Sequence, residues 1–205
     1  VAAGTTVADL DYSATNALAL NGATIRDAAA NNAVLTLANP GAANSLANNK
    51  ALVIDTTAGS VSSVGSDNPN ATKKIGDTVF VKVQFSELMV VTGTPTLTLE
   101  TGGTDQVVNY FSGNNSTSFI FAYIVQAGDT SADLDYTGTN ALALNGGTIK
   151  DAAGNVTTLT LAAPGDAGSL GNAKAFVIDG VAPTVTNVTS ATGDGTKKQD
   201  DVVSI

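Results

Sequence analysis

The chain has 205 residues with no cysteine and no histidine, and its 18 acidic against 9 basic residues give a formal net charge of −9. Without cysteine, neither disulfides nor thiolate metal sites can form, and without histidine the usual proton shuttle at neutral pH is missing. The acidic balance excludes a nucleic-acid-binding surface, which needs clustered lysine and arginine, and suits divalent cations instead. No apolar run approaches the roughly 20 residues that span a bilayer, so we expect no membrane span.

An internal repeat organises the chain. Residues 8–12 read ADLDY, residues 132–136 read ADLDY again, and the match continues without a gap at a constant offset of 124 residues. Solenoid units have about 20 to 50 residues, so each period is expected to be an autonomous domain. The offset predicts the back half of one repeat (1–57), one complete repeat (58–180) and the first strands of a third (181–205), with both chain ends inside domains.

Alternation of apolar and polar residues predicts strands along the complete repeat. In residues 78–85 the odd positions are apolar and should form a core face, and residues 96–100 alternate in the same way. Residues 119–125 are apolar on both faces, which predicts a central strand. Further strands are expected at 107–111, 132–136, 142–144, 159–161 and 175–178, and a strand at 185–188 should open the next domain.

Helical periodicity is nearly absent. The alanine-rich residues 28–33 could form one helical turn, but their second copy carries Gly154, which argues against a stable helix. All six phenylalanines fall within 58–180, so a closed core is expected there, whereas residues 1–57 alone should be poorly packed. About seven to nine short strands in about 120 residues predict an all-β fold, a Greek-key β-sandwich of immunoglobulin-like (Ig-like) type.

Four motifs resemble those of a known family: FSE at 85–87, ADLDY at 132–136, IKDAAGN at 149–155 and VIDGVAP at 177–183. Together they resemble the bacterial Ig-like, cadherin-like tandem repeats of giant extracellular surface adhesins. The resemblance implies tandem Ig-like sandwiches at the bacterial cell surface, a role in adhesion, fibres or biofilm, and calcium bound where domains meet. The chain departs from the pattern at its first linker, where Gly59 stands in place of Pro183 and predicts a less stiff connection.

Paired aspartates are the first candidate metal ligands. A strand at 132–136 would send the carboxylates of Asp133 and Asp135 to one face, where they repel unless water or a cation separates them. Calcium takes six to eight oxygen ligands, so the pair could form half of a coordination shell, although an ordinary solvated strand face is the alternative. Asp9 and Asp11 repeat the pattern.

A second group of candidates lies at turns and repeat ends. Asp151 and Asn155 bracket Ala-Ala-Gly, and Asp27 and Asn31 bracket three alanines, a spacing that fits a tight turn, metal ligation or both. By analogy with cadherin-like arrays, calcium would stiffen the crossing into the next repeat. The hypothesis is a junction site to which the following domain adds oxygens, while Glu87 could equally be a solvated charge at a strand end. The junction set is Glu87, Asp151, Asn155 and Asp179, and the full candidate set adds Asp133, Asp135, Asp9, Asp11, Asp27 and Asp55.

The sequence favours a structural role over catalysis. Without histidine or cysteine only carboxylate pairs could catalyse, and the candidate pair recurs in both copies as scaffold residues do, so we expect no enzyme. The leading hypothesis is a structural or adhesive module that extends or stiffens a surface stalk or fibre. Its expected partners are neighbouring repeats of the same chain and other copies in a fibre.

Two alternatives stay open at this point. A glycan-binding module predicts exposed aromatic residues on loops, for which Tyr110 and Phe111 are the candidates. A filament or sheath subunit could assemble by strand exchange. In that case residues 181–205 of one chain and 1–57 of another would still lack counterparts of residues 82–124, so most of two or three core strands would be missing.

Overall fold

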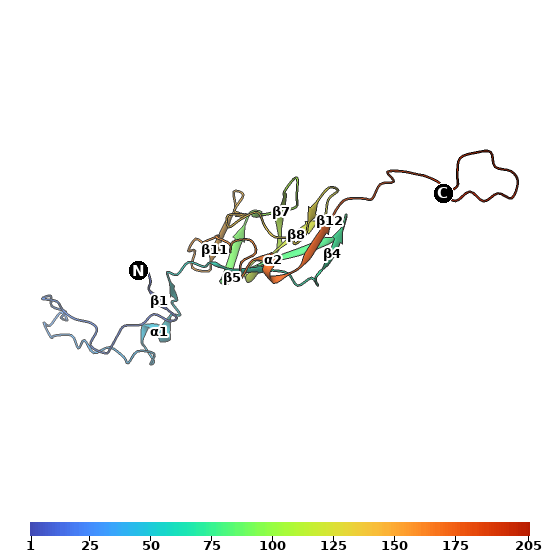
Figure 1. Cartoon of the computed structure of the whole chain (residues 1–205). Coiled ribbons are helices and arrows are strands. Elements are labelled where there is room, and N and C mark those ends of the chain that lie inside the picture. The colour runs from blue at the N-terminus through green and yellow to red at the C-terminus, as the bar shows by residue number, and fades with distance from the viewer.

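The structure is a computed structural model that describes residues 1–205. It contains twelve strands and two single-turn helices, which confirms the all-β fold. A compact β-domain occupies the middle of an elongated molecule, and the two terminal segments leave from its opposite ends (Figure 1). The Greek-key order of connections and the domain boundaries stay predictions.

The larger sheet has seven strands in the order β10-β6-β7-β8-β5-β11, with β3 also paired to β5. Every pair in it is antiparallel. The residues of β8 form the central strand that their sequence predicted. The strands are β3 (Val61–Gly65), β5 (Thr78–Thr92), β6 (Thr96–Leu99), β7 (Gln106–Ser112), β8 (Ser116–Ile124), β10 (Leu142–Ala143) and β11 (Thr148–Asp151).

A second sheet of three strands has the order β4-β12-β9. Its strands are β4 (Ala71–Lys74), β9 (Thr130–Ser131) and β12 (Phe176–Asp179). Strand β12 pairs in parallel with β4 and antiparallel with β9. Because Phe176 and Ile178 alternate with exposed residues, β12 adds one apolar face to the core.

The hydrophobic core forms one cluster of 23 buried residues, all between Val64 and Ile178. The odd positions of β5 from Val79 to Phe85 are buried, as their alternation predicted. In β8, Phe119 and Phe121 face the same core, and Phe119 packs edge-on against Phe85 with ring centroids 4.8 Å apart. Neither 1–57 nor 181–205 contributes a residue to this cluster, in line with the distribution of phenylalanines.

Several short predicted elements differ in the structure. Residues 132–136 carry only an isolated bridge at Tyr136, because their backbone bonds are divided between neighbours: the Leu134 N–H donates to the Phe176 carbonyl, and the Asp135 carbonyl accepts from the Glu100 N–H. Residues 159–161 and 185–188 form no strand. Residues 28–33 form no helix. The two helices are instead α1 (Leu46–Asn49) and α2 (Leu170–Ala173), each capped by a serine hydroxyl, of Ser45 and Ser169.

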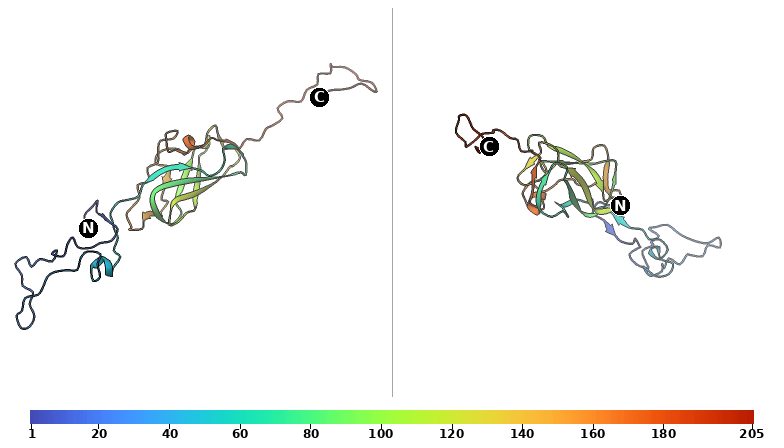
Figure 2. Two further views of the ribbon diagram at one scale, coloured as in Figure 1. Left: turned by 90° about the horizontal axis from the view of Figure 1, so that it is seen from below. Right: turned by 90° about the vertical axis from the view of Figure 1, so that its right-hand side faces the viewer.

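The N-terminal segment forms one small two-stranded sheet from β1 (Thr6–Val7) and β2 (Ile54–Asp55). Two further views show this segment at one end of the β-domain and residues 181–205 as an extended tail at the other (Figure 2). None of the helices is long and apolar enough to cross a membrane. Strand β2 is followed by a short linker that enters the β-domain at β3.

Candidate metal centre

Three carboxylates meet where the chain passes from β2 into the β-domain. Asp55, Glu87 and Asp151 each offer an oxygen, and these oxygens all lie within 4.8 Å of one another. Asp55 is the last residue of β2, Glu87 lies within β5, and Asp151 is the last residue of β11. We call this group the junction cluster, because by the 124-residue offset Asp55 ends one repeat and the other two belong to the next.

Glu87 takes an inward position in a core strand. It continues the odd positions of β5, with Phe85 before it and Met89 after it both buried. The register between β5 and β8 shifts between Gln84 and Met89, so the ladder is interrupted around Glu87. The half-buried carboxylate therefore lies at the end of the core rather than on a solvated strand face.

Asp151 is held by a tight turn. Its Oδ1 accepts a hydrogen bond from the Asn155 backbone N–H (2.9 Å), and its Oδ2 accepts one from Asn155 Nδ2 (2.7 Å). The side chain is buried, which alone raises its pKa, but hydrogen bonds from Asn155 and from the Gly154 and Ala153 amides together lower the pKa below its ordinary value of 3.8. Asp151 is thus ionised at neutral pH. The turn bonds to Asn155 and metal ligation by Asp151 are therefore compatible.

Asp55 is fixed by a similar local bond. The Thr57 backbone N–H donates to Asp55 Oδ1 (2.9 Å), and the counterpart bond in the second linker runs from the Val181 N–H to Asp179 Oδ1 (3.2 Å). The two linkers therefore share one turn although their sequences differ. Asp179 is the last residue of β12, at the end of the last strand as expected.

The linker after Asp55 is pinned to the β-domain. The Thr158 N–H donates to the Gly59 carbonyl (3.0 Å), and the Ser60 N–H donates to Ser86 Oγ (3.0 Å). Gly59 packs so closely that a Cβ there would lie 2.7 Å from Met89 Sδ and 3.3 Å from Glu87 Cγ. The glycine therefore lies in close contact with the β-domain, and the lower stiffness expected of this linker stays a prediction.

Negative charge is uncompensated in the junction cluster. Neither of the two salt bridges in the chain involves Asp55, Glu87 or Asp151. Burial raises the pKa of Glu87 above its ordinary value of 4.5, and the charges of Asp151 and Asp55 raise it further. Three carboxylates could supply three to six of the oxygens that a hard divalent cation requires, so the cluster could hold a metal ion.

The paired aspartates do not share a face. Asp133 is exposed, while Asp135 is buried and accepts hydrogen bonds from the Tyr136 N–H (2.9 Å) and the Gly165 N–H (3.0 Å). The expected strand that would align them is missing, so they form no half-shell. Their counterparts behave alike: Asp9 is exposed, and Asp11 accepts from Tyr12 and Gly41.

The remaining candidates lie apart from the junction cluster. Asp27 is exposed and bonds Asn31 in the same turn that joins Asp151 to Asn155. Asp179 is exposed at the end of β12, on the side from which the C-terminal tail leaves (Figure 1). The structure thus brings Asp55 of the preceding repeat, rather than Asp179, together with Glu87 and Asp151.

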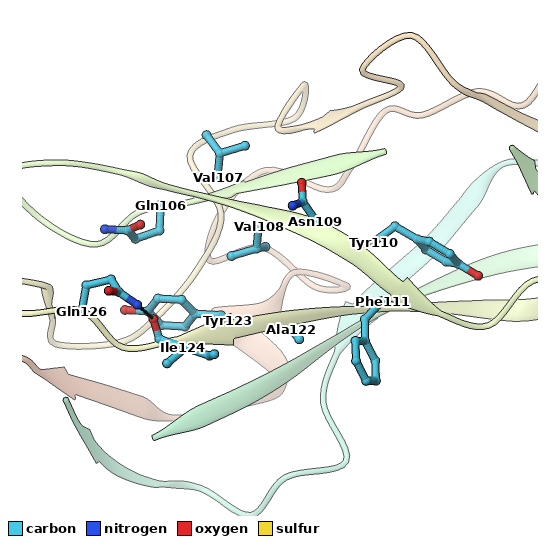
Figure 3. Close-up of a pocket in the computed structure, with 10 residues that line it drawn as sticks. All are labelled: Gln106, Val107, Val108, Asn109, Tyr110, Phe111, Ala122, Tyr123, Ile124 and Gln126. Carbon is cyan, nitrogen blue, oxygen red and sulfur yellow. Dashed lines mark hydrogen bonds between the residues drawn. The ribbon is translucent and has the colours of Figure 1, made fainter. Parts of the chain in front are cut away.

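The candidate aromatic pair lies on strand β7, not on a loop. Tyr110 packs on the core ring of Phe119 at 5.3 Å between centroids, whereas Phe111 is 63% exposed and contacts Phe80 at 5.7 Å. Figure 3 shows the two neighbouring side chains pointing in different directions beside a shallow pocket between β7 and β8. Phe80, whose even position in β5 faces outward, was not singled out from the sequence.

Comparison with family models, with curated proteins and with solved structures found no match to this chain. The group of acidic side chains in the chain that could hold a metal ion is the junction cluster of three carboxylates, beside the Asn155 amide. Its chemistry is oxygen coordination of a hard cation.

Proposed function

We propose that this chain is a structural module of a long repetitive extracellular protein, in which a calcium ion at each junction stiffens the array. The observation that supports the proposal is the junction cluster, in which Asp55 ends one repeat and meets Glu87 and Asp151 of the next. A cation bound there would contact both repeats and restrain the linker between them. The acidic net charge and the resemblance to surface adhesin repeats point the same way.

Electrostatics favours a divalent cation at this position. Burial and two neighbouring charges raise the pKa of Glu87, so bringing the three carboxylates together without a cation is unfavourable. Calcium accepts flexible sets of carboxylate and carbonyl oxygens, whereas magnesium demands a near-ideal octahedron and keeps several waters. An irregular cluster drawn from three strands, β2, β5 and β11, therefore suits calcium better.

The arrangement of the segments supports an extending role. The preceding repeat and the following segment leave from opposite ends of the β-domain (Figure 2). Repeats joined in this way lengthen a stalk or fibre instead of folding back on one another. The proposed partners are neighbouring repeats and other copies in a fibre at the bacterial cell surface.

Calcium dependence of the full 205-residue chain tests the proposal. Thermal unfolding and small-angle X-ray scattering would be compared in excess calcium, in excess magnesium and in chelator. We expect calcium to raise the melting temperature and narrow the distribution of molecular lengths, because a ligand that binds only the folded state stabilises it by mass action. Identical melting and scattering in all three conditions would rule out a calcium-stiffened junction.

A second candidate function is glycan binding at the exposed aromatic pair. Phe111, which lines the pocket in Figure 3, and its neighbour Phe80 present exposed ring surface on the outer side of the larger sheet. Such rings can stack on the apolar faces of sugars. NMR titration with bacterial and host oligosaccharides would show shifts at β7 and β8 that Phe111→Ala removes, and unchanged spectra would exclude this candidate.

A further inference from the structure

The side chain of Asn155 crosses the boundary between the two repeats. Its Nδ2 donates to the backbone carbonyl of Asp55 at 3.1 Å and lies 3.4 Å from the carbonyl of Thr57, while it also donates to Asp151 Oδ2 at 2.7 Å. The surrounding atoms are all oxygen acceptors, so only the amide nitrogen can face them. The orientation of this amide is therefore determined by its contacts.

We propose that Asn155 is a latch that holds the linker of the preceding repeat on the β-domain before any cation binds. The Asp151 turn holds the latch in place through two hydrogen bonds: the Asn155 N–H donates to the side-chain Oδ1 of Asp151, and the Asp151 N–H donates to the Asn155 carbonyl. Asn155 is thus a positioning residue, since it orients Asp55 toward Glu87 and Asp151. The latch itself does not depend on calcium, and only its effect on cation affinity rests on the proposed function.

Recognition through main-chain carbonyls explains how one latch can serve linkers of different sequence. The first linker reads TTAG at 56–59, and its counterpart reads GVAP at 180–183. The latch contacts carbonyl oxygens of Asp55 and Thr57, which every residue type provides. We therefore infer that the counterpart of this turn in a following repeat would receive the GVAP linker in the same way.

The chain contains a matched control for this residue. Asn31 makes the same bonds to Asp27 as Asn155 makes to Asp151, but it is exposed and contacts no linker. An effect of turn chemistry alone would thus be common to both asparagines. An effect of the latch is expected only at Asn155.

The test compares backbone dynamics of residues 56–59 by NMR in the full chain, in chelator, for wild type, Asn155→Ala, Asn155→Asp and Asn31→Ala. We expect the order parameters of the linker to fall from about 0.85 to below about 0.6 in both Asn155 variants and to stay unchanged in Asn31→Ala. Asn155→Asp keeps the size of the side chain but lacks the amide donor. Amide signals of β5 and β8 show whether each variant remains folded, and an ordered linker in a folded Asn155→Asp chain would overturn the latch.

Calcium titration of the same variants separates the latch from the proposed function. Loss of a residue that orients metal ligands typically weakens affinity about 10- to 100-fold, which we expect for Asn155→Ala. If wild type binds no calcium but its linker order depends on Asn155, the cation proposal fails and the latch is supported. If calcium binds and linker order is insensitive to Asn155, the latch fails and the cation proposal remains.

Discussion

Residues 1–57 and 125–181 are two copies of one stretch of sequence, but only the second has a complete domain around it. Their local hydrogen bonds agree closely: the Tyr12 hydroxyl donates to the Ala38 carbonyl at 2.7 Å, and the Tyr136 hydroxyl donates to the Ala162 carbonyl at 2.7 Å. Sheet register also agrees, since Thr6 pairs with Asp55 as Thr130 pairs with Asp179. Local sequence alone is therefore sufficient for these loops and bridges.

Burial separates the two copies. Leu46 is 36% exposed at the start of α1, whereas its counterpart Leu170 is fully buried at the start of α2. The difference arises because β3, β5, β6, β7 and β8 cover the second copy and nothing comparable covers the first. Hydrogen bonding in this repeat is thus a local property, while the apolar stabilisation depends on strands distant in sequence.

The largest effect that tests this division is a pair of leucine truncations. Leu170→Ala should lower the free energy of unfolding by about 2 to 5 kcal/mol, because it leaves a cavity in the core, whereas Leu46→Ala should change it by about 0.5 kcal/mol or less. Urea unfolding followed by far-UV circular dichroism measures both. Similar losses for the two variants would mean that the first copy shares a cooperative core.

The next largest effect is stabilisation by calcium at the junction cluster. It involves only one site, because the 124-residue offset places no counterpart of Glu87 within residues 1–57. At calcium concentrations about 100 times the dissociation constant, calcium should stabilise the chain by about 2.7 kcal/mol, and Glu87→Gln should remove this increment. Asp133→Asn, which neutralises an exposed carboxylate outside the cluster, is the control. Differential scanning calorimetry with and without calcium measures the increment, and an undiminished increment in Glu87→Gln would exclude the cluster.

The same variant predicts a pH effect without calcium. The folded-state pKa of Glu87 is raised, chiefly by burial and then by Asp151 and Asp55, so the folded state binds the proton more tightly than the unfolded state. Stability from this group is therefore present below pH 4.5 and is lost as the pH rises through the raised pKa. Glu87→Gln should abolish that decline in stability. Unfolding curves measured between pH 4 and 8 in chelator test this, and a decline that persists in the variant would contradict it.

A smaller difference is expected from the paired tyrosines. Tyr136→Phe removes a hydrogen bond that a fully buried tyrosine donates to the half-buried Ala162 carbonyl, and should cost about 1 kcal/mol. Tyr12→Phe removes the same bond from a tyrosine that is only half-buried, so its effect on the free energy of unfolding should be smaller. Urea unfolding of both variants checks this, and equal costs would contradict the distinction in burial.

The smallest effect concerns one backbone conformation. Gly154 has a φ of 94°, and its counterpart Ala30 adopts a φ of 69° in the first copy. A Cβ at Gly154 would meet open space, so Gly154→Ala should cost only the strain of the left-handed conformation, about 1 kcal/mol. Thermal unfolding measures it, and a loss of several kcal/mol would indicate a packing role that the open space does not suggest.

Sequence reasoning predicted the elements that follow strong periodic patterns. The alternation of β5 and the two-sided apolar run of β8 led directly to the core, and the repeat offset led to the junction residues. Asp135 was misplaced because its carboxylate accepts a hydrogen bond from Gly165, which lies 30 residues later in the chain. Asp55 and Asp179 occupy identical places in the repeat, so only the three-dimensional path of the linker decides which one meets Glu87.

The same pair of aspartates provides the most direct test of the calcium-bridged junction. Isothermal titration calorimetry of the full chain with calcium would compare wild type, Asp55→Asn and Asp179→Asn. We predict about one calcium ion per chain, an affinity at least about tenfold weaker in Asp55→Asn, and no change in Asp179→Asn, because only Asp55 lies in the junction cluster. No calcium binding by the wild type, or equal effects of the two variants, would contradict the account.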